Sequence, residues 1–143
     1  MQMRAGVVAI LVGTFVNWCL SGLYHMVIAK DMLAEAYKPF ESVMRQEADQ
    51  PGPWIWMIPL ALMAWLLLRI LTQTGGPVAV GRGAMWGVTM SIVMTVVYEI
   101  SMCMWFNYSN TAMAAVNIGW DALAWGITGA VMALVYSKLY KAA

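Results

Sequence analysis

The sequence predicts an all-α integral membrane protein, a four-helix bundle with a short amphipathic helix in the first outer loop. Hydrophobic residues make up 62% of the 143 residues and charged residues only 10%, whereas a soluble domain carries roughly 25% charged residues. Four apolar runs each reach the length of about 20 residues that a membrane-spanning helix needs. The net charge of +1 gives no basis for binding nucleic acid. The lipid bilayer is therefore the expected surrounding of this chain.

The four predicted spans form a single transmembrane domain over residues 1–143. They occupy residues 5–29, 53–72, 83–106 and 116–136. Each must be helical, because lipid offers no partner for unpaired backbone N–H and C=O groups. The first run is longer than the apolar segment of about 7–15 residues in a signal peptide. We therefore interpret it as a retained span.

The distribution of basic residues predicts the orientation. Four spans return the chain to its starting side, so the N-terminus, the middle loop and the C-terminus share one side. That side carries five basic residues: Arg4, Arg69, Arg82, Lys138 and Lys141. On the opposite side, Lys30, Lys38 and Arg45 are diluted by acidic residues. The bias of basic residues toward the cytoplasm predicts that both termini are cytoplasmic.

The first outer loop has its own helical pattern. Apolar residues recur there at helical spacing: Leu33, Ala36, Tyr37, Phe40 and Met44. This pattern predicts one or two short amphipathic helices on the outer surface. Such a segment serves either as an ordered connector or as a lid or docking surface for a partner.

Polar residues form a stripe on three of the spans. The stripes consist of Thr14, Asn17, Ser21 and His25 on the first span, Ser91, Thr95 and Glu99 on the third, and Asn117, Asp121 and Thr128 on the fourth. Steps of three and four place side chains on one helix face. At a rise of 1.5 Å per residue, His25 and Asp121 lie roughly 7 Å and Glu99 roughly 10 Å from the outer ends of their spans. Since a charged group that faces lipid costs at least about 2.5–3.5 kcal/mol, we expect the three faces to meet.

The expected meeting point is a polar cluster near the outer surface. Its candidate residues are His25, Glu99, Asp121, Asn17, Asn117 and Tyr98. The first interpretation is a hydrogen-bonded cluster that fixes the helix register. A second is a site for an ion, a proton or a small polar ligand. A third is a metal site with His25, Glu99 and Asp121 as ligands, a set that suits iron, manganese or zinc.

Two other cofactors fit single features of the sequence. Sulfur ligands for Cu(I) lie near the same level: Met26, Met102, Cys103 and Met104. His25 alone has the chemistry of an axial haem ligand. The sequence requires no cofactor, and a metal ion is compatible with it. It contains no G-x-S-x-G, P-loop or H-E-x-x-H motif, which favours a non-enzymatic protein.

The second half of the chain resembles a family of small, uncharacterised four-span bacterial membrane proteins, known as a domain of unknown function. The similar segments are GAMWG at 83–87, YEIS at 98–101 and DALAWG at 121–126, the last matching a D-x-x-x-W-G signature. The family has an acid before a Trp in its first span, where this chain has Asn17 and Trp18. The resemblance implies the four-span fold, the polar cluster and a bacterial inner membrane, but no activity.

Together these features predict a small integral membrane protein that acts as a non-enzymatic subunit or binding protein of a larger membrane assembly. Its expected partners are the lipid bilayer and other membrane proteins or further copies of the chain, because four short spans enclose little interior but expose much surface. The alternative is a small ion- or proton-coupled transporter or metal-binding protein that uses His25, Glu99 and Asp121.

Overall fold

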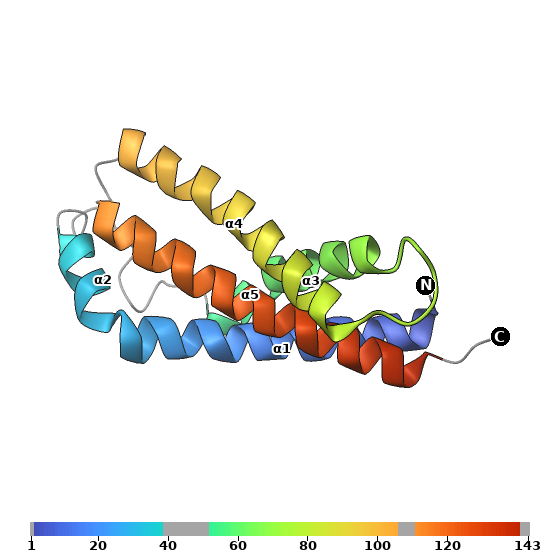
Figure 1. Ribbon diagram of the computed structural model, residues 1–143. Coiled ribbons are helices and arrows are strands. Elements are labelled where there is room, and N and C mark those ends of the chain that lie inside the picture. Colours follow the sequence, from blue (N-terminus) through green and yellow to red (C-terminus); the bar gives the residue numbers. More distant parts are fainter. Residues whose placement is uncertain (1, 39–51, 106–110, 141–143) are drawn as a thin grey trace.

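The computed structural model describes residues 2–38, 52–105 and 111–140, and every regular element in these ranges is helical (Figure 1). The elements are α1 (Met3–Leu23), a π-helical turn (Tyr24–Ile28), α2 (Lys30–Tyr37), a 3-10 turn (Pro53–Trp56), α3 (Met57–Leu71), α4 (Val80–Trp105) and α5 (Thr111–Leu139). The two termini lie at one end of the bundle and α2 lies at the other. We call these the termini end and the α2 end.

Within the described ranges, four helical segments are long and apolar enough to cross a membrane: Met3–Ile28, Trp54–Leu71, Val80–Met102 and Thr111–Leu139. The four predicted apolar runs are thus confirmed as helices, although two predicted starts are late. Helix α4 begins at Val80 rather than 83, and α5 at Thr111 rather than 116. Hydropathy marks the apolar segment, whereas helical hydrogen bonding continues into its flanks.

The first span ends in a π-helical turn. The N–H of Ala29 donates to the carbonyl of Tyr24 at 2.8 Å, five residues back. Ala29 then leaves helical geometry, with φ −103° and ψ 7°, and α2 starts at Lys30. The predicted amphipathic helix is therefore present from Lys30 to Tyr37, and its predicted members Phe40 and Met44 lie outside the described residues.

Helix α3 is the shortest of the candidate spans. A 3-10 turn that begins at Pro53 leads into it, and Pro59 follows as its third residue. Proline costs little there because the N–H groups of a first turn lack an intrahelical acceptor in any case. The buried residues of α3 all lie in its second half: Ala64, Leu67, Leu68 and Leu71.

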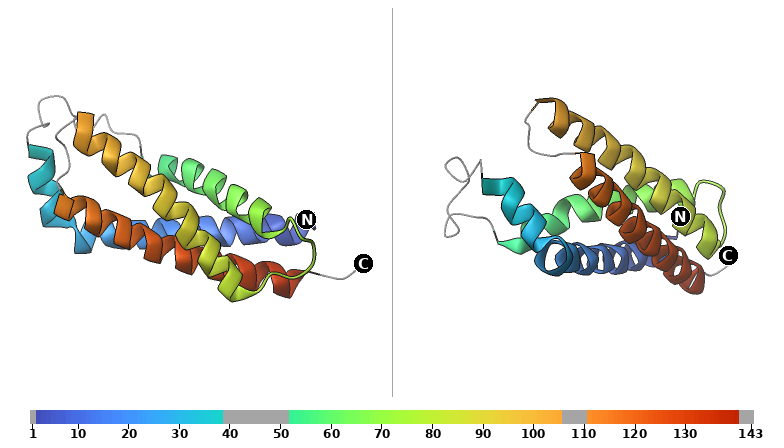
Figure 2. Two further views of the ribbon diagram at one scale, coloured as in Figure 1. Left: turned by 45° about the horizontal axis from the view of Figure 1, so that its top comes forward. Right: turned by 60° about the vertical axis from the view of Figure 1, so that its left-hand side comes forward.

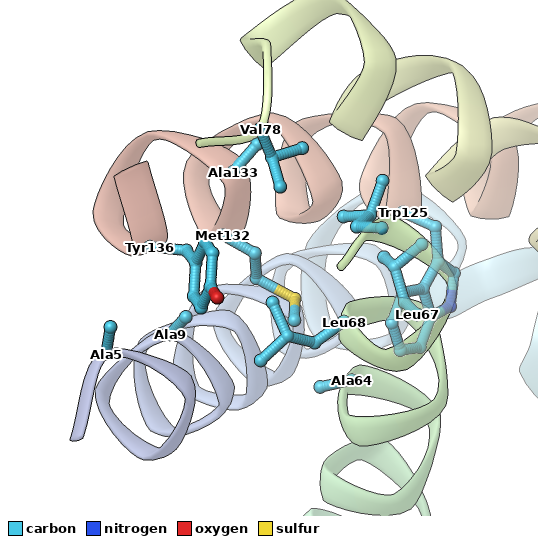
Figure 3. Packing of buried hydrophobic residues seen from close by; sticks show 11 residues of the cluster. Ala5, Ala9, Ala64, Leu67, Leu68, Val78, Trp125, Met132, Ala133 and Tyr136 are labelled. Carbon is cyan, nitrogen blue, oxygen red and sulfur yellow. The ribbon is translucent and has the colours of Figure 1, made fainter. Parts of the chain in front are cut away.

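The packed core occupies the termini end. Figure 3 shows Leu67 and Leu68 of α3 beside Trp125 and Met132 of α5 and Ala9 of α1. All but Trp125 are at most 1% exposed, and Trp125 is 7% exposed. Helices α1, α3 and α5 thus pack tightly against one another in this half of the molecule.

Helices α4 and α5 form an antiparallel pair held at backbone contact. A Cβ atom added to Gly83 would lie 2.2 Å from the carbonyl oxygen of Gly129, and one added to Gly87 would lie 2.0 Å from that of Trp125. Only glycine permits this approach, as in other helix pairs built on small residues four apart. Helix α5 also packs against α1, while α1 and α4 have almost no contact with each other (Figure 2).

Candidate functional site

A single stripe on α4 leads from the glycine contact to the polar residues. Gly83, Gly87, Ser91, Thr95 and Glu99 recur at steps of four, and all five are buried. The side chains in this stripe increase in size along the helix, from the glycines through Ser91 and Thr95 to Glu99. The helices accordingly cross near the termini end and diverge toward the α2 end (Figure 1). The stripe leaves space between α4 and α5 for polar side chains only in the α2 half.

Two hydrogen bonds join α4 to α5 in that half. The hydroxyl of Thr95 donates to Asp121 Oδ2 at 2.7 Å. One turn further along α4, Glu99 Oε1 accepts a hydrogen bond of 2.7 Å from Asn117 Nδ2. A step of four forward on α4 is thus matched by a step of four back on α5, as an antiparallel pair requires. The two carboxylates therefore lie one turn apart on facing helices.

Asn117 connects three helices. Its Nδ2 donates to Glu99 on α4, and its Oδ1 accepts a hydrogen bond from the hydroxyl of Tyr24 in the π-helical turn. The Tyr24 ring stacks on Trp120 of α5, with centroids 5.3 Å apart and an interplanar angle of 16°. One amide on α5 thus joins the ends of the first and third spans.

A second polar link lies one layer closer to the termini end. Asn17 Nδ2 donates to Thr128 Oγ1 at 3.1 Å, and Asn17 Oδ1 accepts from Ser21 at 3.3 Å. Thr128 in turn donates to the carbonyl of Ala124 at 2.8 Å. Asn17 is 1% and Thr128 0% exposed. This buried group is satisfied by its own members and ties α1 to α5.

In the group around Glu99, Asn117 and Asp121, not every buried polar atom has a hydrogen-bond partner in the described part of the chain. Glu99 is 2% exposed, and its Oε2 has no hydrogen-bond partner within the described ranges. The indole Nε1 of Trp120 is buried and equally unpaired there. Burial without a partner costs a polar group roughly 1–3 kcal/mol, and a charged one more. Such a cost in one small region marks the cluster as the candidate functional site.

Apolar residues enclose this site at both ends. Toward the α2 end lies a cluster of Tyr24, Ala29, Leu33 and Met113, with Met32, Ala36 and Trp120 packed against it. Leu33 brings α2 over the ends of α1 and α5. Toward the termini end lies the core around Trp125 and Met132. The polar groups therefore lie in a layer between two apolar layers.

The structure brings three of the six predicted site residues together: Glu99, Asn117 and Asp121. Asn17 belongs instead to the separate group around Thr128. His25 interacts electrostatically with Asp121, but it is exposed, and its ring meets the edge of the Tyr24 ring with centroids 5.3 Å apart. Tyr98 is 51% exposed on another face of α4.

Tyr24 takes the place that the sequence pattern assigned to His25. At about 100° per residue, Tyr24 lies about 20° from the direction of Asn17 on a helix, whereas His25 lies about 80° away. The steps from Thr14 through Asn17 and Ser21 to Tyr24 are three, four and three, the spacing of a packed helix seam. That spacing was the signal in the sequence that could have identified Tyr24.

The three proposed metal ligands do not form a metal site. Within the part of the chain that the structure describes, no group of three or more His, Cys, Asp and Glu side chains is placed to hold a metal ion. For the copper alternative, Met26 is 76% exposed, and the Cys103 side chain lies outside the described part. The site instead offers carboxylate, amide and hydroxyl oxygens.

No family model, curated protein or solved structure matches this chain.

Proposed function

We propose that this chain is a small multi-pass protein of the bacterial inner membrane, with both termini in the cytoplasm, and that it acts as a non-enzymatic subunit of a larger membrane assembly. Four helices of sufficient length and hydropathy support the membrane location. The two termini lie at the same end of the bundle, as an even number of spans requires. The excess of basic residues at that end supports the cytoplasmic orientation.

The observation that carries the subunit proposal is the incomplete packing of the α2 half. The 3-10 turn before α3 and the first half of α3 are exposed, with Trp54 at 64% and Trp56 at 66% in the turn and Leu62 at 62% in the helix. Because α1 and α4 have almost no contact, α5 alone connects them in this half among the described residues. Asp121 faces α4, where it accepts the hydrogen bond from Thr95, and it interacts electrostatically with Tyr24 and His25 at the end of the first helix. It is only partly buried.

Asp121 makes this incomplete packing costly in lipid. It stands ten residues after the start of α5, about 15 Å along the helix at 1.5 Å per residue. The five residues that α5 adds before the predicted apolar run lie outside that run, so Asp121 keeps its expected place roughly 7 Å inside it. A carboxylate that faces lipid is costly, by about 2.5–3.5 kcal/mol or more at the centre of a span. A helix of another membrane protein, or of a second copy, packed between α1 and α4 would cover it.

Native mass measurement after gentle solubilisation tests the proposal. We expect a particle with more than one polypeptide, either several copies of this chain or this chain with another membrane protein. We also expect Asp121→Leu to weaken that association, because partner groups facing the carboxylate lose their polar contact. Leu123→Ala is the matched control, since Leu123 is 52% exposed on the opposite face of α5. A strictly monomeric wild-type particle without a co-purifying protein would refute the subunit role.

A further inference from the structure

The buried carboxylate of Glu99 is held by only one of its two oxygens. Asn117 Nδ2 donates a hydrogen bond to Oε1. If the carboxylate rotated to offer Oε2 to Asn117 instead, Oε1 would lose this hydrogen bond. The Asn117 Oδ1 atom is already used as the acceptor for Tyr24. Oε2 is left buried and unpaired within the described ranges. A group from outside the chain would complete the contacts of this oxygen.

No salt bridge within the described ranges joins Glu99 or Asp121 to a basic side chain, and the one salt bridge found there links Lys38 to Glu35 on α2. His25 interacts electrostatically with Asp121, but it is exposed and forms no salt bridge with either carboxylate. Two carboxylates one turn apart on facing helices repel each other when both are charged. A bound cation would relieve this repulsion and also satisfy Oε2.

The donor atoms around Glu99 select the kind of cation. They are all oxygens: Glu99 Oε2, the Asp121 carboxylate, and the Thr95 hydroxyl, whose lone pairs stay free while it donates to Asp121. Oxygen ligands alone favour hard cations, whereas copper, zinc and iron sites usually include sulfur or nitrogen ligands. Mg²⁺ gives up its waters reluctantly. A layer closed at both ends by apolar clusters instead suits a monovalent cation, which loses its water more easily. Among these, Na⁺ is smaller than K⁺, approaches carboxylate oxygens more closely and therefore interacts with them more strongly.

We propose that Na⁺ binds between Glu99 and Asp121, with Glu99 Oε2, the Asp121 carboxylate and the Thr95 hydroxyl as its protein ligands. The buried Glu99 supplies the charge that Na⁺ balances. The hydrogen bond from Asn117 orients the carboxylate, and the apolar cluster around Leu33 separates the ion from bulk water. This site does not depend on the subunit role, because it lies within one chain.

Thermal unfolding of the purified full-length protein in detergent tests the site. Choline chloride is replaced stepwise by NaCl at constant ionic strength. Tm should rise with the Na⁺ concentration and reach a plateau when the site is saturated. KCl and MgCl₂ should give smaller shifts at equal concentration. An equal Tm in NaCl and choline chloride would overturn the proposal. Protein mass, measured in parallel, reports on subunit association separately.

Two substitutions locate the ion. Glu99→Gln keeps the side-chain shape and should raise the Na⁺ concentration for half-saturation at least about tenfold, since affinity follows the charge and number of ligands. Thr95→Val removes one oxygen ligand at nearly constant shape and should weaken Na⁺ binding even if Glu99→Gln does not fold. Glu35→Gln, on the exposed face of α2, is the control and should bind Na⁺ as the wild type does. A Thr95→Val or Glu99→Gln protein with the wild-type Na⁺ response would contradict the assignment.

Discussion

Replacing Gly87 with alanine should separate α4 from α5. The added Cβ would lie 2.0 Å from the carbonyl oxygen of Trp125 and 2.7 Å from its carbonyl carbon, where ordinary contacts begin at 3.4 Å. Both neighbours are backbone atoms, so no side-chain rotation relieves the clash. The two helix backbones must therefore move apart by a distance on the order of the 1.4 Å between 2.0 Å and 3.4 Å, the kind of backbone shift that overpacking forces on a well-packed interface.

The cost of this shift follows from the contacts that it breaks. Overpacking of a close interface costs about 1–3 kcal/mol. The shift also stretches the hydrogen bonds of Thr95 and Glu99, which lie on the same stripe of α4. Gly119→Ala in α5 is the matched control, because a Cβ there meets no atom within 4 Å. We expect that control to leave the free energy of unfolding unchanged or to raise it, since alanine favours helix over glycine.

Reversible unfolding in mixed detergent and SDS micelles measures the difference, with the fluorescence of the eight tryptophans as the signal. Gly87→Ala should unfold at a lower SDS fraction than Gly119→Ala, with a free energy of unfolding at least about 1 kcal/mol smaller. Equal unfolding of the two variants would refute the glycine-mediated contact between α4 and α5.

The same unfolding assay tests three further substitutions. Tyr24→Phe removes the hydroxyl that donates to Asn117 but keeps the ring, and should cost about 0.5–1.5 kcal/mol, the net worth of one hydrogen bond. His25→Ala should change the free energy of unfolding by less than about 0.5 kcal/mol, as expected for an exposed side chain; a larger loss than for Tyr24→Phe would return His25 to the cluster. Ser137→Ala should cost about 1–3 kcal/mol, because its hydroxyl accepts from the N–H and donates to the carbonyl of buried Val78, both at 2.7 Å; wild-type stability would show that this link between the α3–α4 loop and α5 is dispensable.

The helices were predictable because hydropathy alone marks them. The polar stripe of Ser91, Thr95 and Glu99 also predicted the face that α4 turns toward α5, and the structure shows that the same spacing of four continues back to Gly87 and Gly83. The sequence did not show that α3 buries only its second half. Its apolar residues are spread along the whole helix, and packing against α1 and α5, rather than composition, decides which of them are enclosed.

The sequence predicted which acidic and amide side chains belong to the site, but not which hydrogen bonds they form. Asn117 and Glu99 follow from helical periodicity, because each belongs to a stripe. The pairing of Asn117 with Tyr24 depends on the register between α1 and α5 and on the π-helical turn, which no local pattern indicates. From Ser21, a step of three leads to Tyr24 and a step of four leads to His25, and both steps are compatible with one helix face. Only the position of the neighbouring helix α5 shows which of the two side chains points toward the cluster.

One amide on α5, that of Asn117, holds the buried Glu99 carboxylate of α4 within a polar layer of the bundle. A double-mutant cycle with Asn117→Ala and Glu99→Ala measures this link directly through the free energies of unfolding of the two single variants and the double variant. We predict a coupling energy of about 0.6–1.7 kcal/mol, the range from the average to the strongest hydrogen bond between membrane helices. A coupling energy of zero would show that Asn117 and Glu99 do not meet.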